Sequence, residues 1–151
     1  MIDDATPLGT TFDGPVRRMS IERLLAFSGG RFSEPGWPAR NLHTDAAKAA
    51  EAGLARPIAS GLQPQGHIIR LMLDLSGEAW SRAGSIRLRF RRPVYVGDSI
   101  RARARLTDRT ADSQAIVYTL EVWSERQDGE IAVTGSATCR IQKAGEQEER
   151  H

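Results

Sequence analysis

His43 lies in the segment GWPARNLHTD, residues 36–45, and is one of three histidines in the chain. An imidazole titrates near neutral pH, so a histidine can accept and release the protons of acid/base catalysis. Asn41, two residues earlier, could orient this ring or donate to a substrate, or it could bond its own loop backbone. We therefore weigh two roles for His43, a general acid/base or a polar residue at the start of a helix.

Ser60 and Gly61 precede a long apolar segment and offer a second kind of chemistry. The N–H groups at the start of a helix carry a partial positive charge and can stabilise an anion. Glycine has no side chain, so a ligand can approach the backbone of Gly61 closely. Ser60 is expected to cap the helix rather than act as a nucleophile, because no Ser-His-acid order is readable around it.

The bulk composition excludes several function classes. The chain has 151 residues and a net charge of +2, which suits one globular domain and gives no reason to expect nucleic-acid binding. Cys139 is the single cysteine, so we expect no disulfide and no cysteine-based metal site. No stretch approaches the roughly 20 apolar residues of a membrane helix, and the acidic N-terminus does not resemble a secretory signal. These features predict a cytoplasmic protein that binds no membrane.

Helix signals divide the first half of the chain. Residues 1–13 are rich in Gly, Pro, Asp and Thr and predict a flexible lead-in with a possible strand. Ser20 predicts the N-cap of a helix that ends near Gly29, and Thr44 predicts the cap of a second helix that ends at Gly53. A long helix is predicted next, within the segment PIASGLQPQGHIIRLMLDL.

Apolar residues occupy two faces of this long helix, so we expect it to be buried around most of its girth. One face carries Leu62, Gly66, Ile69 and Leu73, and the other carries Ile68, Leu71, Met72 and Leu75. His67 lies among them and is expected to be a buried histidine with its hydrogen bonds satisfied.

From Ser85 onward, apolar residues alternate with polar ones, which is typical of strands. The segments SIRLRFRR, IRARARL, AIVYTLEVWSE and IAVTGSATCRI predict four antiparallel strands. One buried helix and one antiparallel sheet fit together when the sheet curls around the helix. We therefore predict an α+β fold with a single hotdog domain over residues 14–142 and a disordered tail over residues 143–151.

Four segments, in this order, resemble the MaoC-like dehydratases, the hotdog family that includes the (R)-specific enoyl-CoA hydratases. NLHTDAAKAA is similar to the Asn-Pro-Ile-His loop and the Ala-rich helix after it, and RPIASGL resembles the Pro-Ile-Ala-His-Gly start of the central helix. LRFRRPVYVGDSI is similar to the Phe-x-x-Pro-Val-x-x-Gly-Asp strand and turn, and VTGSATCRI to the closing Gly-x-Ala strand. The resemblance covers residues 20–141 and implies that His43 is the catalytic histidine.

The catalytic Asp that the resemblance implies is missing. It should lie five residues before His43, where this chain has Pro38, and the Ser-Gly that should precede it is followed by Gly30. Glu34 and Asp45 could replace it, although Asp45 also suits the positive end of a helix.

The long loop before His43, GGRFSEPGWPARNL, departs from the short segment of the family. Its two prolines restrict the backbone, so we expect an ordered loop. We predict that it folds over the mouth of the site, with Trp37 packed inward and Glu34 the carboxylate nearest to His43. Trp37 would either anchor the loop on the core or wall an acyl pocket.

The resemblance implies a hydratase or dehydratase that acts on an α,β-unsaturated acyl thioester of coenzyme A or a carrier protein. His43, Asn41 and Glu34 would be catalytic, and Gly61, Ser60 and Trp37 would bind substrate. No cofactor or metal is expected, and a homodimer or larger hotdog oligomer is implied.

Three alternatives stay open: a non-catalytic hotdog partner or acyl-binding subunit, an isomerase with one base, and a thioesterase. The last is disfavoured because the early central helix carries Gln63 and Gln65 instead of a carboxylate, and its first acid is Asp74.

The arginines of the predicted strands, at 87 to 105, alternate with apolar residues and should share the outer face of the sheet. A solvated face is the simpler expectation. The alternative is a docking surface for coenzyme A phosphates or an acidic carrier protein, because the forked guanidinium matches phosphate oxygens.

Overall fold

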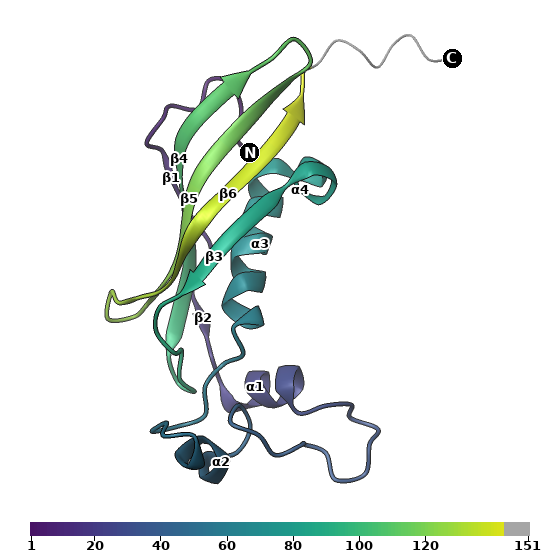
Figure 1. The fold of residues 1–151 in the computed structure, drawn as a ribbon, viewed down its shortest axis with the longest axis vertical. Helices are drawn as coiled ribbons and strands as arrows, with labels where there is room; N and C mark the ends of the chain where they lie inside the picture. Colours follow the sequence, from purple (N-terminus) through teal and green to yellow (C-terminus); the bar gives the residue numbers. More distant parts are fainter. Residues whose placement is uncertain (144–151) are drawn as a thin grey trace.

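The computed structural model describes residues 1–143, so the predicted tail over residues 143–151 lies almost wholly outside the described residues. Four helices and six strands form within the described part (Figure 1). The helices are α1 (Ile21–Ser28), α2 (Ala46–Glu51), α3 (Leu62–Ser76) and α4 (Glu78–Ala83). The strands are β1 (Thr11–Asp13), β2 (Arg17–Arg18), β3 (Ser85–Phe90), β4 (Ser99–Ala111), β5 (Ala115–Arg126) and β6 (Ile131–Gln142).

The strands form one antiparallel sheet in the order β1-β4-β5-β6-β3, and β2 also pairs with β4. Alternation in the sequence explains how the sheet is buried: Ala102, Ala104 and Leu106 of β4 face the core, whereas Arg105 between them is exposed. Figure 1 shows α3 lying along one face of the curved sheet. The predicted α+β hotdog architecture, with the sheet wrapped around the long helix, is confirmed.

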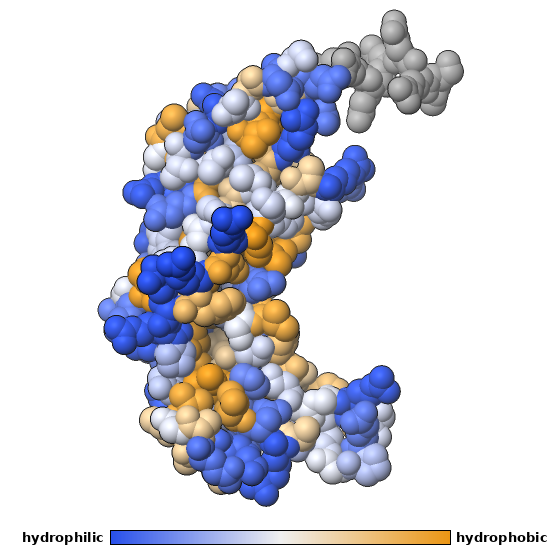
Figure 2. Space-filling model, in the orientation of Figure 1, coloured by the Kyte–Doolittle hydropathy of each residue, from blue (hydrophilic) through white to orange (hydrophobic). Residues whose placement is uncertain are grey.

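The long helix is buried on one face only. Ile68, Leu71, Met72 and Leu75 pack into the core, as predicted. The other face stays open: Leu62 is 59% exposed, and Ile69 and Leu73 are only partly buried. The prediction of a helix buried around most of its girth is therefore wrong for a single chain, because the sheet wraps around only one side of it. Figure 2 shows hydrophobic residues along the hollow side of the molecule, where Figure 1 places α3.

The first 13 residues differ from the flexible lead-in that the composition predicts. The side chain of Ile2 is buried in the core, and its N–H donates to the carbonyl of Leu75 at 2.8 Å. The hydroxyl of Tyr118 donates to the Asp4 carboxylate at 2.9 Å. Residues 11–13 form β1, the possible strand, which pairs with β4. These contacts attach the segment to both α3 and the sheet, which composition alone does not reveal.

The start of α1 and the end of α3 follow simple capping rules. Ser20 caps α1, as predicted, and its hydroxyl accepts from the N–H of Arg23 at 3.4 Å. The short helix α4 was not predicted. It begins after Gly77, whose φ of +57° turns the chain at the end of α3, and it buries Trp80 against the core.

Within residues 1–143, no helix is both long and apolar enough to cross a membrane.

Candidate functional site

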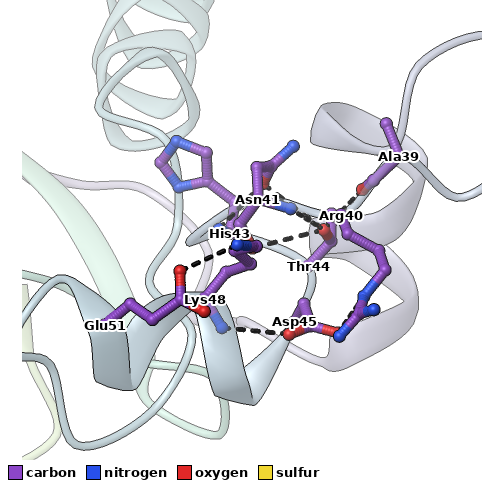
Figure 3. Close-up of polar contacts among 8 residues, drawn as sticks. All are labelled: Ala39, Arg40, Asn41, His43, Thr44, Asp45, Lys48 and Glu51. Atoms are coloured by element: carbon purple, nitrogen blue, oxygen red, sulfur yellow. Dashed lines mark hydrogen bonds and ion pairs between the residues drawn. The ribbon is translucent and has the colours of Figure 1, made fainter.

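The imidazole of His43 is fixed by one strong contact. Its Nδ1 lies 2.8 Å from the carbonyl oxygen of Ile58, on the segment that leads into α3. A carbonyl oxygen can only accept, so Nδ1 must carry the proton. In the neutral ring, Nε2 is therefore the unprotonated nitrogen, with its lone pair available as a base. Figure 3 shows the ring pointing away from the polar contacts of the loop, rather than into them.

Asn41 uses its whole side chain to hold the loop. Its Oδ1 accepts from the backbone N–H of His43 at 2.9 Å, and its Nδ2 donates to the carbonyl of Ser28 at 2.9 Å. The second bond ties the loop to the end of α1. Asn41 therefore positions the His43 backbone, and neither of its polar atoms contacts the imidazole. This agrees with the expectation of a loop residue that bonds its own backbone.

Asp45, not Thr44, is the N-cap of α2, which corrects the predicted cap. The Asp45 carboxylate accepts from the N–H of Lys48 at 3.0 Å and from Arg40 Nε at 2.8 Å (Figure 3). The bond from Arg40, followed by that from Lys48, lowers the pKa of this carboxyl. Thr44 instead donates to the carbonyl of Ala39 at 2.6 Å. Asp45 is thus engaged in structural contacts and does not reach the His43 ring.

The structure does not bring Glu34 to His43. Its side chain is 62% exposed, and the cation beside it is Arg31, whose Nε lies 3.9 Å from the carboxylate. In the described part of the chain, no carboxylate forms an ion pair with His43. Glu34 is therefore not supported as the replacement for the missing acid.

In Figure 1, the loop between α1 and α2 extends outward, away from the start of α3. Figure 2 shows it as a lobe at the same position. Trp37 packs on Phe32, with ring centroids 4.6 Å apart, and beside Gly29. Phe32 itself is 68% exposed. The prediction that the loop covers the site is wrong for a single chain, because its aromatic residues pack on one another and on the end of α1.

The start of α3 offers free backbone donors. Among the described residues, neither Ser60 nor Gly61 has a hydrogen-bond acceptor for its backbone N–H. The Ser60 hydroxyl accepts from the N–H of Leu62 at a long 3.4 Å, so the expected cap is weak. A Cβ on Gly61 would lie 3.0 Å from the ring of Phe90. The absence of a side chain at Gly61 therefore allows the Phe90 ring to pack against the helix start.

A pocket of about 390 Å³ opens at this helix start. Its lining includes Ile58, Gly61, Phe90, Arg91 and Arg92. His43 is not itself a lining residue, but Ile58, whose carbonyl oxygen contacts the imidazole, is, and it connects the histidine to the pocket. Sequence reasoning missed Ile58 and Phe90. The role of Ile58 is carried by its backbone, which leaves no signal in the residue type, and Phe90 was predicted only as part of the strand alternation.

The arginines of β4 are largely neutralised by acidic residues on neighbouring strands. Arg101 and Arg103 both approach Asp13 and Glu125, and Arg105 lies 2.5 Å from Glu121. The outer face of β4 is therefore a network of ion pairs, which supports a solvated face over a phosphate-docking surface there, whereas Arg87 and Arg89 of β3 form no ion pair with any described residue. Arg91 and Arg92, at the pocket, have only long contacts, with Thr134 at 3.4 Å and Glu130 at 4.0 Å. In residues 1–143, no cluster of three or more His, Cys, Asp or Glu side chains could hold a metal ion.

The chain is similar to known proteins in sequence and in fold. A family model described as MaoC like domain matches residues 40–127, which begin just before His43 and exclude most of the long loop. The chain is 33% identical to an (R)-specific enoyl-CoA hydratase of Aeromonas caviae over 104 residues, which are 66% of this chain and 73% of that protein.

Solved structures show the same fold. The A. caviae (R)-hydratase involved in PHA biosynthesis aligns with a TM-score of 0.68 and 25% identity over 90% of this chain and 97% of that one. A chain of the ChsH1-ChsH2 complex from Mycobacterium tuberculosis aligns with a TM-score of 0.69 and 18% identity, over 91% of this chain and 99% of that one. With its fold, its histidine loop and its family match taken together, the chain belongs to the MaoC-like dehydratase family.

Proposed function

We propose that this protein adds water to, or removes it from, an α,β-unsaturated acyl thioester, with His43 as the general acid/base. The observation that carries the proposal is the bond between His43 Nδ1 and the Ile58 carbonyl. That bond selects the tautomer with a basic Nε2, and Ile58 also lines the pocket at Gly61. Kinship with an (R)-specific enoyl-CoA hydratase supports the thioester as the substrate class.

In the hydration direction, His43 Nε2 accepts a proton from water while the water oxygen bonds to the β-carbon. The electrons of the carbon–carbon double bond move through the α-carbon to the thioester oxygen, which becomes an enolate. The free N–H of Gly61, at the positive end of α3, stabilises this charge. The imidazolium then returns its proton to the α-carbon. One residue performs both transfers, so both new bonds form on the same face of the substrate.

Arg91 and Arg92 suit the carrier half of such a substrate. Both line the pocket that contains Gly61, and both keep most of their hydrogen-bonding capacity free. A guanidinium binds phosphate oxygens through two parallel N–H groups. We therefore assign contact with the phosphates of coenzyme A or of a carrier-protein prosthetic arm to these two arginines, rather than to those of β4.

Paired variants of His43 and Glu34 test the assignment. In crotonyl-CoA hydration followed by loss of enoyl absorbance, His43→Gln should lower kcat/KM by about 10²–10⁴-fold. Glu34→Gln removes a carboxylate that is 62% exposed and should leave the rate within about twofold, like other surface substitutions. The assignment fails if His43→Gln retains near wild-type turnover, or if Glu34→Gln loses as much activity as His43→Gln does.

A second candidate is a non-catalytic hotdog partner that completes the site of another subunit. The observation in its favour is that no described carboxylate reaches His43, in a family whose motif carries one. The fold similarity to a chain of a two-component complex is compatible with it. The purified chain alone decides: turnover of crotonyl-CoA without any second protein contradicts this candidate, and inactivity that a related subunit rescues supports it.

We also propose that the chain forms a homodimer through the edge of its sheet. Within the described residues, β3 pairs with β6 on one side only, so its other edge is unpaired. Phe90, the last residue of β3 and part of the pocket lining, is 52% exposed, and Leu62 at the start of α3 is 59% exposed. An unpaired edge strand with apolar neighbours is a template for pairing with another chain. A second copy there would cover the mouth of the pocket.

A further inference from the structure

A second pocket, of about 100 Å³, lies on another side of α3. It forms between α3, β4 and the segment 15–23, which includes β2 and the start of α1. Its lining residues come from β2, α1, α3, β4 and the turn before β2, and they are Pro15, Arg17, Arg23, His67, Arg70 and Ala102. None of them lines the pocket at Gly61, so the two spaces are separate.

His67 contributes an unsatisfied group to this pocket. Its Nδ1 is buried and has no hydrogen-bond partner among the described residues. A buried polar atom without a partner costs stability, and native proteins rarely keep one without a reason. The expectation of a buried histidine with satisfied hydrogen bonds is therefore wrong. A ligand that accepts a hydrogen bond from this nitrogen would satisfy it.

Positive charge surrounds the same pocket. Arg17 and Arg23 form no ion pair with any described residue, whereas Arg101, Arg103 and Arg105 of β4 are paired. Arg70 reaches Asp74 on its own helix at 3.0 Å, through side chains that are 71% and 49% exposed. Burial, followed by the charges of Arg17 and Arg23, lowers the pKa of His67. Two cations without an ion-pair partner among the described residues thus lie beside His67 at a small pocket.

We propose that this pocket is a binding site for a small oxyanion, a carboxylate or a phosphate group. Arg17 and Arg23 donate charge-assisted hydrogen bonds to its oxygens, and His67 donates from Nδ1. Arginine suits both groups because its forked N–H donors match two oxygens at once. The size of the pocket fits an inorganic ion or the terminal group of a larger ligand, and the two arginines favour an anion over a neutral molecule.

Titration with inorganic phosphate and with acetate tests the site. Full-length protein at constant ionic strength is followed by isothermal titration calorimetry and by the imidazole NMR signals of His67. We expect saturable binding of at least one anion, with a rise in the pKa of His67 on binding, because an anion favours the charged ring. Tighter binding of phosphate assigns the site to a phosphate group, and tighter binding of acetate assigns it to a carboxylate.

The variant Arg17→Gln/Arg23→Gln should weaken binding by about tenfold or more, because it removes both charge-assisted contacts. Arg31→Gln/Arg82→Gln is the matched control: it removes the same charge from side chains that are 84% and 75% exposed and lie outside the pocket. Circular dichroism checks the fold, and the single variant Arg23→Gln serves if the double variant unfolds. Absence of saturable binding by either anion, or equal weakening in the double variant and its control, overturns the proposal.

Discussion

A substitution at Gly61 tests two proposed roles of this glycine: it makes room for the Phe90 ring, and it leaves its backbone N–H open to the thioester oxygen. Its φ of −55° is helical, so alanine can adopt the backbone, but the added Cβ would lie 3.0 Å from the Phe90 ring. The same methyl group would hinder the approach of a thioester oxygen to the Gly61 N–H. We predict that Gly61→Ala lowers kcat/KM for crotonyl-CoA on the order of 100-fold, as expected when an oxyanion donor is lost.

The double variant Gly61→Ala/Phe90→Leu is the control for this substitution. The smaller leucine relieves the contact with the new methyl group, so thermal stability should return toward wild type. Activity should stay low if access to the N–H is what matters. Recovery of activity together with stability would show that Gly61 only makes room for Phe90.

His67 gives a prediction for the pH dependence of stability. Its pKa in the folded protein is lowered from 6.5, so the unfolded chain binds a proton at a higher pH than the folded chain does. Stability therefore falls as the pH drops below 6.5 toward the lowered pKa. The groups that face the ring are Arg17 of β2, Arg23 of α1 and Arg70 of α3, and all stay charged over this range.

The measurement is the melting temperature of wild type and His67→Gln between pH 8 and pH 5, in a buffer free of phosphate and carboxylate. The melting temperature of the wild type should fall more steeply than that of the variant as the pH drops. Parallel curves would show that His67 titrates with an ordinary pKa.

At the scale of the elements, the junction between α3 and α4 depends on one backbone conformation. Gly77 has φ +57° and ψ −140°, a region that side chains disfavour, and no atom lies within 4 Å of a Cβ built there. Gly77→Ala should therefore destabilise the fold by about 1–3 kcal/mol through backbone strain alone.

At Gly66 the same substitution to alanine should have the opposite effect on the stability of the fold. This glycine lies inside α3, on its open face, and a Cβ there would also meet no atom within 4 Å. Gly66→Ala should stabilise the helix by about 0.5–1 kcal/mol, because alanine loses less backbone entropy on folding. Chemical denaturation of Gly77→Ala and Gly66→Ala measures the free energy of unfolding of each variant. Destabilisation of equal size in the two would mean that steric contacts, and not φ, decide the outcome.

The strands were predictable from the sequence because alternation encodes which side of a strand is buried, and Leu106 beside Arg105 behaves as that rule requires. The helix α4 was missed because its six residues are too few to show a period. The site was predictable in part. His43 is marked by its loop, but its contact with Ile58 depends on the path of a segment 15 residues away, which no local pattern specifies. The reach of Glu34 depends likewise on how a long loop packs.

At the scale of the whole molecule, a single chain leaves its proposed site unfinished. The pocket at Gly61 is open, the outer edge of β3 is unpaired among the described strands, and the apolar side of α3 lines the hollow in Figure 2. The sheet covers one face of α3 and cannot cover the other. The two-sided apolar pattern of this helix, which is wrong as a description of one chain, is what a helix at an interface between copies requires.

Association is therefore the last prediction. By light scattering after size exclusion, the purified protein should have twice the 16.6 kDa mass of one chain. Leu62→Glu/Phe90→Glu should shift it toward the monomer, because a twofold axis brings each new charge near its copy. Leu8→Glu, at a residue that is 57% exposed in the N-terminal segment, is the matched control and should remain a dimer. A monomeric wild type would contradict an interface at this edge, and so would a dimer that survives both substitutions at Leu62 and Phe90. The hollow would then be open to a different subunit.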